Sequence, residues 1–474
     1  MKNILKLLML LPLFLVSSCS DNLESLNVDN KNATVASAGS FLSNAQKNLA
    51  ENIHGVAYRA TGPSIGKLWA QHLTSVTYLE GSTYVPEFSW APLYDILKDL
   101  DESAKVVTAT QTTVATELTE QKNRLAILEI MKVYTWATLV EAYGDIPYSE
   151  ALDFNNALPK YDDAKTVYTD LISRLSTAIA NLDTKGTSFG TADLIYAGNV
   201  SNWLKFGNSL KLRMGLRIID AVPALGAETV AAAASGVFTS NADNARFRYL
   251  ADYPNTNPWW SFLVRENLKY YVGTNTFVGT LNTLNDPRRA VFFTPIGSEY
   301  LGAQYGIVQR YESFSREGAL IREPTLPVIF MDYAQVEFLL AEAAERNIAS
   351  VTNAQTHYNA AIKASFDYYG VGSAAADYLA QPTVNYTTAE GPWQKKIGIQ
   401  KWIALFDQGF EAWTEYRRLD YPVLQAPAIA ESTIVPVRFR YPINEQTLNA
   451  GSYATAASAI GGDQYTTRLF WDVK

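Results

Sequence analysis

The chain has 474 residues, of which 48% are hydrophobic, and its formal net charge is −8 at pH 7. This length and composition are typical of a folded chain with a large core, and the acidic balance excludes the basic surface that nucleic-acid-binding proteins use. Aromatic residues are abundant, with 28 Tyr, 20 Phe and 10 Trp. Tyr and Trp suit surfaces that contact ligands, although they also fill helical cores.

The single cysteine, Cys19, closes an N-terminal signal. A basic start is followed by an apolar stretch, Leu7 to Val16, which is shorter than the roughly 20 residues that a membrane-spanning helix needs. The segment from Leu15 to Cys19 (LVSSC) resembles a bacterial lipobox, in which the Cys thiol is acylated. We therefore predict a signal peptide over 1–18, lipidation at Cys19 and a polar tether over 19–40, the alternative being an ordinary secretory signal.

The rest of the chain, 41–474, is predicted to be a single, mainly α domain. Apolar residues at helical spacing predict helices at five places: Leu125–Tyr143, Asn202–Asp220, Met331–Arg346, Ala354–Tyr368 and Ile397–Leu419. The helical scaffold is therefore expected mainly over 41–237 and 324–420. Blocks rich in Asn, Gly, Pro and aromatic residues predict an irregular binding region, mainly over 238–323, 370–396 and 421–474.

Two helix pairs fit the spacing of tetratricopeptide repeats, in which large aromatic, Leu, Tyr and Ala residues recur at fixed offsets. The first combines a helix carrying Trp136, Leu139 and Tyr143 with one carrying Ala164, Tyr168 and Leu171, after an insertion over 144–162. The second combines Phe338 and Ala341 with Ala354, Tyr358 and Ala361. Any amphipathic helix pair can produce such matches, and tetratricopeptide-like packing is the interpretation that we favour.

Catalytic motifs are weak, and we predict that the protein is not an enzyme. Gly62–Gly66 matches a G-x-S-x-G nucleophile pattern at Ser64, but the strand that should precede it is unconvincing. With three His and no H-E-x-x-H motif, a catalytic zinc site is not expected. Glu415 and Arg418 are three residues apart on one predicted helix and indicate an ion-pair network. No cofactor is predicted, and a structural calcium ion has no support in the sequence.

Several segments together resemble the SusD/RagB-like outer-membrane lipoproteins of Bacteroidota. They occur in order along essentially the whole chain: 143–148 (YGDIPY), 203–213 (WLKFGNSLKLR), 285–288 (NDPR), 336–344 (VEFLLAEAA), 400–406 (QKWIALF), 411–418 (EAWTEYRR), 436–442 (PVRFRYP) and 470–472 (FWD). The resemblance implies four tetratricopeptide-like helix pairs that carry an irregular ligand-binding region. It also implies a lipid-anchored protein of the cell outer membrane that faces the exterior.

The same resemblance implies a function and a partner. A SusD-like protein captures oligosaccharide or polysaccharide and delivers it to a SusC-like TonB-dependent outer-membrane transporter, over which it sits as a hinged lid. The alternatives are a peptide-binding, RagB-like protein of the same kind and, much less favoured, a lipid-anchored hydrolase. The sequence names neither the glycan nor its linkage and length.

Aromatic residues on the irregular segments are the candidates for the ligand site. Sugars present apolar C–H faces that pack on aromatic rings, while polar side chains bind their hydroxyls. Most Trp residues fall in the scaffold motifs, which leaves Trp259, Trp260 and Trp393 on loops. Tyr84 and Tyr311, which follows Arg310, are the next candidates. We predict that at least one of the three Trp rings stacks on the ligand.

Overall fold

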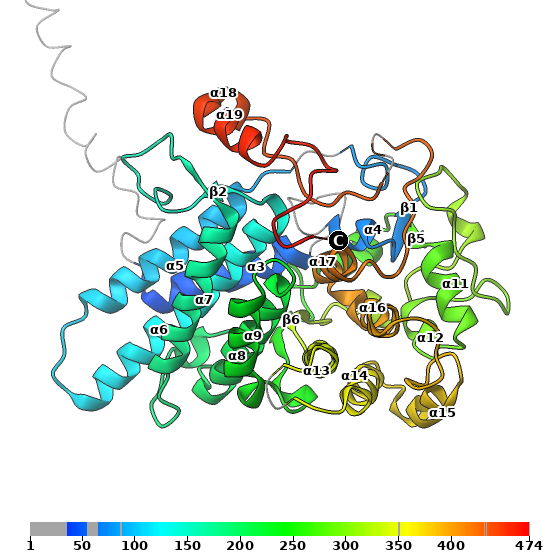
Figure 1. Cartoon of the computed structure of the whole chain (residues 1–474), viewed down its shortest axis with the longest axis horizontal. Coiled ribbons are helices and arrows are strands. Elements are labelled where there is room, and N and C mark those ends of the chain that lie inside the picture. Colours follow the sequence, from blue (N-terminus) through cyan, green and yellow to red (C-terminus); the bar gives the residue numbers. More distant parts are fainter. Residues whose placement is uncertain are drawn as a thin grey trace, which may run out of the picture. The chain divides into compact units, whose positions relative to one another are not determined.

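Helices are the main regular structure of the protein, as shown by a computed structural model that describes residues 36–54, 65–85, 88–348, 351–430, 432 and 434–473 (Figure 1). The predictions for Cys19, the signal peptide and Ser64 lie outside these residues. Residues from Ala38 onward cluster as one compact unit. Within the described part of the chain, no helix is both long and apolar enough to cross a bilayer.

In the described residues, four helix pairs form the scaffold, and each pair packs mainly against itself. They are α3 (Ala38–His54) with α5 (Ala91–Ala109), α6 (Ala115–Tyr143) with α7 (Ala164–Asn181), α8 (Val200–Ile218) with α9 (Pro223–Ala233), and α13 (Tyr333–Glu345) with α14 (Ala354–Tyr368). In Figure 1 they run from the blue and cyan helices at the left to the yellow helices at the bottom. The mainly α, tetratricopeptide-like fold predicted from the sequence is confirmed.

Local sequence explains where four of these helices, α7, α8, α13 and α14, begin. Asp163 accepts a hydrogen bond from the backbone N–H of Thr166, and Asn199, Asp332 and Asn353 cap α8, α13 and α14 in the same way. Each cap satisfies one of the backbone N–H groups that a helix leaves unpaired at its start. The polar residue before each apolar run therefore sets the boundary.

The predicted repeat contacts are present in both helix pairs. Phe338 and Ala341 share a buried cluster with Tyr358 and Ala361, which joins α13 to α14. The insertion between α6 and α7 starts and ends in a short antiparallel pair, β2 (Ile146–Pro147) with β3 (Tyr161–Asp162). The insertion therefore extends a loop without separating the two helices.

One predicted helix is interrupted. The segment Ile397–Leu419 is divided into α16 (Trp393–Ala404), a 3-10 turn (Leu405–Asp407) and α17 (Gly409–Leu419). The reason is close packing with α4 (Gly66–Trp69), because a Cβ atom added at Gly409 would lie 2.4 Å from the backbone nitrogen of Lys67. Two glycines, Gly66 and Gly409, let the backbones touch, and the chain turns between α16 and α17 to reach that contact.

Short elements fill the irregular blocks. The remaining helices are α10 (Pro258–Trp260), α11 (Asn275–Thr283), α12 (Arg289–Phe292), α15 (Ala375–Ala380), α18 (Glu445–Leu448) and α19 (Ala450–Ala459). A π-helical segment, η7 (Ser261–Arg265), follows α10 directly. Single 3-10 turns are η4 (Gly190–Ala192), η5 (Ala234–Gly236), η6 (Asn241–Asp243), η8 (Tyr311–Ser313), η9 (Leu320–Arg322) and η10 (Gly372–Ala374).

Two further antiparallel strand pairs join segments that are distant in the sequence. β4 (Ala245–Phe247) pairs with β6 (Val328–Met331), and β1 (Leu73–Ser75) pairs with β5 (Tyr271–Gly273). In the β1–β5 pair, Leu73 lies opposite Gly273 and Ser75 opposite Tyr271. This pair fixes the loops that follow β1 and precede β5 side by side, which positions the candidate site described below.

A buried charge network ties the scaffold together. The predicted pair on α17 is present, with Arg418 Nη2 2.6 Å from a Glu415 carboxylate oxygen. The network also crosses helices, since Arg217 of α8 contacts Glu141 of α6 at 3.3 Å and Glu411 of α17 at 2.8 Å, and also contacts Glu415. Burial opposes ionisation of Glu415, but Arg418, Lys401 and Arg217 outweigh it and hold its pKa well below the usual range. The buried charges are thus paired and ionised.

Candidate functional site

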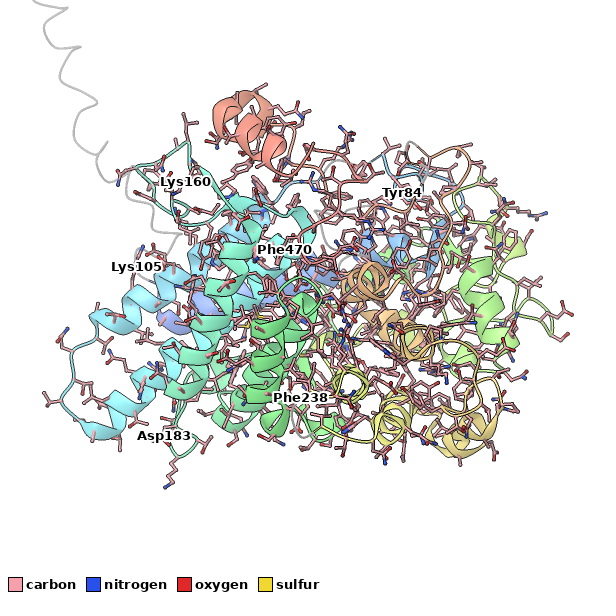
Figure 2. All side chains as sticks on the ribbon, viewed as in Figure 1. Tyr84, Lys105, Lys160, Asp183, Phe238 and Phe470 are labelled. Atoms are coloured by element: carbon pink, nitrogen blue, oxygen red, sulfur yellow. The ribbon has the colours of Figure 1, made fainter. Side chains whose placement is uncertain are left out.

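Two of the residues predicted to bind ligand are enclosed in the core. Tyr84 is 0% exposed and its ring meets that of Trp69 edge to face, with the centroids 6.0 Å apart. Figure 2 labels Tyr84 in the part of the molecule where Figure 1 shows β1. Trp259 is 3% exposed, and Lys67 Nζ lies 5.1 Å from its ring centroid. The prediction that these rings face a ligand is therefore corrected: both pin their loops to the scaffold, which leaves no ring face open.

The two remaining tryptophans lie apart and are half-buried. Trp260 follows Trp259 in α10 and retains partial exposure. Trp393 begins α16, packs against the cluster of Phe338 and Tyr358, and has Arg346 5.3 Å from its ring centroid. The structure therefore does not bring Trp393 together with the α10 tryptophans by any described contact. Ligand stacking at Trp260 or Trp393 stays a prediction.

The most open pair of rings next to a pocket was not among the predicted residues. Tyr78 is 57% exposed and meets Tyr270 edge to face, with ring centroids 4.8 Å apart. The two residues lie at one end of the β1–β5 pair, where the N–H of Val76 donates to the carbonyl oxygen of Tyr270 at 2.8 Å. Two strands thus hold this aromatic pair at the surface, and it offers apolar ring area for the C–H face of a ligand.

A pocket of about 270 Å³ begins within one residue of that pair. Leu268 and Lys269 line it on one side, directly before Tyr270 in the chain. The rest of its wall consists of Leu263, Asn267, Thr294, Tyr311, Arg316, Glu317 and Arg322. The pocket therefore combines aromatic, amide, hydroxyl, cationic and carboxyl groups, which is the mixture expected of a site that binds a polar ligand.

Tyr311 is the one predicted residue that lines this pocket. It is 8% exposed and packs on Val76 and Val272 from the strand pair, which makes it part of the wall and leaves little ring area for stacking. Its cationic neighbour is Arg316, whose guanidinium lies 5.4 Å from the ring centroid. Arg310, the residue beside Tyr311 in the sequence, has a side chain that is 80% exposed and pairs with Glu312. The cation over the Tyr311 ring is therefore Arg316 and not the adjacent Arg310.

The carboxyl group of Glu317 is the most unusual group of the pocket wall. The residue is 1% exposed, and neither carboxyl oxygen has a hydrogen-bond partner among the described residues. Burial raises the pKa of Glu317 to about 7, and its own backbone N–H and the nearby charges of Arg322, Lys67 and Arg316 lower it only in part. At neutral pH this carboxyl therefore exchanges between neutral and ionised forms.

Comparison with known proteins agrees with this fold. The family model for SusD-like proteins, described as "Starch-binding associating with outer membrane", matches residues 29–442. The chain belongs to the SusD-like family. A search of curated proteins gives no match.

Solved structures of SusD-like proteins superpose over nearly the full chain. A chitin-binding SusD homologue from Flavobacterium johnsoniae is 28% identical, with a TM-score of 0.78 over 91% of this chain and 99% of that one. A SusD homologue from Bacteroides thetaiotaomicron is 26% identical, with a TM-score of 0.77 over 93% and 100% of the two chains. A protein described as chitin-binding is 25% identical, with a TM-score of 0.76 over 92% and 100%.

The SusD-like assignment places the protein among binding proteins and not among enzymes. The family is described as associating with the outer membrane and as binding carbohydrate. Among the described residues, no group of His, Cys, Asp or Glu is arranged to hold a metal ion. The chemistry that the site offers is therefore recognition through ring faces and hydrogen bonds.

A second, larger cavity of about 620 Å³ lies between α11, α16 and the loop over 382–390. Its wall mixes threonine and lysine side chains, such as Thr276, Thr280 and Lys395, with aliphatic ones such as Leu284 and Ile399. Of the described residues in its lining, only Tyr358 is aromatic, and that side chain is 1% exposed. We place the candidate site of this SusD-like protein at the Tyr78–Tyr270 pair, because Tyr78 is exposed and the residues directly before Tyr270 line a polar pocket.

The sequence held no signal that separates Tyr78 from Tyr84. Both lie in a polar, Gly- and Ser-containing stretch after β1, six residues apart. Tyr84 is buried because Trp69 and Tyr305 lie against it, whereas Tyr78 contacts Tyr270, a residue nearly two hundred positions away. Exposure is decided by these distant partners, so single-sequence reasoning missed the pair.

Proposed function

We propose that the protein is a surface-exposed outer-membrane lipoprotein that binds oligosaccharide or polysaccharide at the Tyr78–Tyr270 pair. The observation that carries the proposal is this open aromatic pair, held by the β1–β5 strands beside a pocket of mixed polar groups. Membership of a family described as starch-binding supports a saccharide as the ligand, and two similar structures are described as chitin-binding.

The proposal includes the anchor and the partner. Cys19 is acylated, the acyl chains hold the protein at the outer membrane facing the exterior, and a SusC-like TonB-dependent transporter receives the ligand. The lipobox-like sequence and the outer-membrane description of the family support this part. A Cys19→Ala variant should leave the membrane fraction, and the wild-type protein should co-purify with a TonB-dependent transporter from native outer membranes.

The binding test is a screen of the full-length protein against a polysaccharide panel, followed by calorimetric titration of the best ligand with Tyr78→Ala. Losing one ring that packs on the ligand should lower affinity by about tenfold, corresponding to roughly 1–2 kcal/mol. Phe154→Ala is the matched control, because Phe154 is also an exposed ring, at 90%, on the loop between β2 and β3.

Equal affinity of the Tyr78→Ala variant and the wild type would rule out the aromatic pair as the site. Binding of peptides in place of saccharides would move the function to the peptide-binding alternative. Thermal melts of both variants check that each is folded, and we expect little change because both side chains are largely exposed.

A further inference from the structure

Three cationic side chains of the pocket at Tyr311 lack an acidic partner. Lys269, Arg316 and Arg322 line the pocket, and none of them forms an ion pair with any described carboxylate. Arg316 lies over the Tyr311 ring, and Arg322 donates a 3.4 Å hydrogen bond to the carbonyl oxygen of Leu263. Both arginines are partly buried, so their positions are set by the protein and not by solvent alone.

Several buried arginines elsewhere in the protein have an acidic partner. Arg288 contacts Asp286 at 2.6 Å, and Arg438 contacts Asp463 at 2.6 Å. Removing a guanidinium from water without a counter-charge is unfavourable, so proteins normally provide one. The pocket departs from this pattern, which points to a counter-charge that arrives with a ligand.

Glu317 does not supply the missing counter-charge for Arg316 and Arg322. It is the acid in the lining of the same pocket, but no described ion pair joins it to Arg316 or Arg322, and its oxygens accept no described hydrogen bond. The charged and titratable groups that face it are Arg322, Lys67, Arg316 and Tyr311. Lys67 is itself engaged by Asp407, with Nζ 3.1 Å from the carboxylate oxygen.

We propose that this pocket binds the anionic substituent, a carboxylate or a sulfate, of an acidic saccharide. This inference rests on the proposed function, since it names the class of saccharide that the site takes. Guanidinium groups bind carboxylate and sulfate oxygens through paired N–H donors, and Lys269 adds a third positive charge at the rim. The volume of about 270 Å³ lies below the range of roughly 300–1,000 Å³ typical of pockets for larger ligands, so it fits one substituted sugar unit.

The protonation state of Glu317 should make the affinity for an acidic saccharide depend on pH. Below about pH 7 the carboxyl is neutral and the pocket carries only the positive charges of its rim and wall. Above that pH the carboxylate competes with the ligand's anion for Arg316 and Arg322. The affinity for an acidic saccharide should therefore fall between pH 6 and pH 8, while the ligand itself stays ionised.

The test compares three probes on the full-length protein by calorimetry: an oligogalacturonate with carboxylates, a sulfated oligosaccharide, and a neutral chito-oligosaccharide. The wild type should bind one acidic probe at least tenfold more tightly than the neutral probe, and the two acidic arms separate carboxylate from sulfate. Arg316→Gln and Arg322→Gln should each lower the acidic affinity about tenfold and leave neutral binding unchanged.

Arg310→Gln is the matched control, because it removes the same charge from the same segment with an 80% exposed side chain outside the pocket. It should change neither affinity. A wild type without preference for an acidic probe, or an Arg316→Gln variant that keeps the preference, would overturn the inference. If neutral saccharides still bind through Tyr78, only the anionic pocket fails. If no saccharide binds at all, the proposed function fails with it.

Discussion

Buried charged groups are paired with each other in the scaffold, whereas a buried carboxyl in the candidate site has no described hydrogen-bond partner. In the scaffold, Arg217 is 1% exposed and is surrounded by Glu141, Glu411 and Glu415. In the pocket, Glu317 is equally buried, yet it has no hydrogen-bond partner among the described residues. A self-satisfied network stabilises one arrangement of helices, whereas unsatisfied groups cost stability and remain available to a ligand. The paired charges therefore mark the part of the protein that stabilises the fold, and the unpaired groups mark the part that we propose binds the ligand.

The largest effect should come from breaking the scaffold network. Arg217→Met removes the ion pair of Glu141, whose carboxylate keeps the hydrogen bond from the Tyr168 hydroxyl, 2.6 Å away, and it weakens the compensation of Glu411. Breaking a buried ion pair typically costs about 3–5 kcal/mol, and we expect the lower end because Lys401 and Arg418 still neutralise Glu415. Urea unfolding measures the loss. Arg310→Met, which breaks an exposed pair, should stay within about 0.5 kcal/mol of the wild type, and a similar loss in both variants would contradict the comparison.

The pocket should show the reverse effect, because removing its acid stabilises the protein. The folded pKa of Glu317, about 7, lies above the ordinary value of 4.5, so its stability contribution is fully present below pH 4.5 and is lost as pH rises to 7. The free energy of unfolding should fall by an amount on the order of 3 kcal/mol over this pH range. Glu317→Gln should therefore raise the free energy of unfolding at pH 8 and change it little at pH 4.5, as measured by urea unfolding at both values.

Glu312→Gln removes an exposed acid from the same segment and should not alter the pH dependence of stability. If Glu317→Gln were destabilising at pH 8, the ionised carboxylate of Glu317 would be stabilised by a partner in the folded protein. The pocket would then pair its buried charge as the scaffold does, which contradicts the comparison.

The smallest effects are expected at the half-buried tryptophans. Trp260→Ala and Trp393→Ala should keep the protein folded, and we expect at least one of them to lower saccharide affinity by roughly 1–3 kcal/mol through a lost stacking contact. Calorimetric titration with the ligand found in the panel decides between them. Unchanged affinity in both variants would leave the Tyr78–Tyr270 pair as the whole aromatic contribution. Trp259→Ala is unsuitable as a binding variant, because that ring is buried and its loss would destabilise the fold.

The helical scaffold follows from local sequence patterns. Helical spacing of apolar residues and polar caps at positions such as Asp163 and Asn199 act within a few residues, so the α6–α7 and α13–α14 pairs could be predicted locally. The order of the motifs along the chain likewise indicated the family. The break between α16 and α17 could not be predicted, because it depends on Gly409 meeting Lys67, a residue more than three hundred positions away.

Which aromatic rings are exposed depends on contacts between distant segments of the chain. Tyr78, Tyr84 and Trp259 are similar in local sequence setting, and their exposures of 57%, 0% and 3% follow from which distant segments cover them. The same holds for charge, since Arg310 and Arg316 differ by six positions but only Arg316 lies over Tyr311 in the pocket wall. Local patterns report backbone conformation, which is a short-range property. Exposure and pairing of side chains depend on long-range packing, and a single sequence carries no direct record of it.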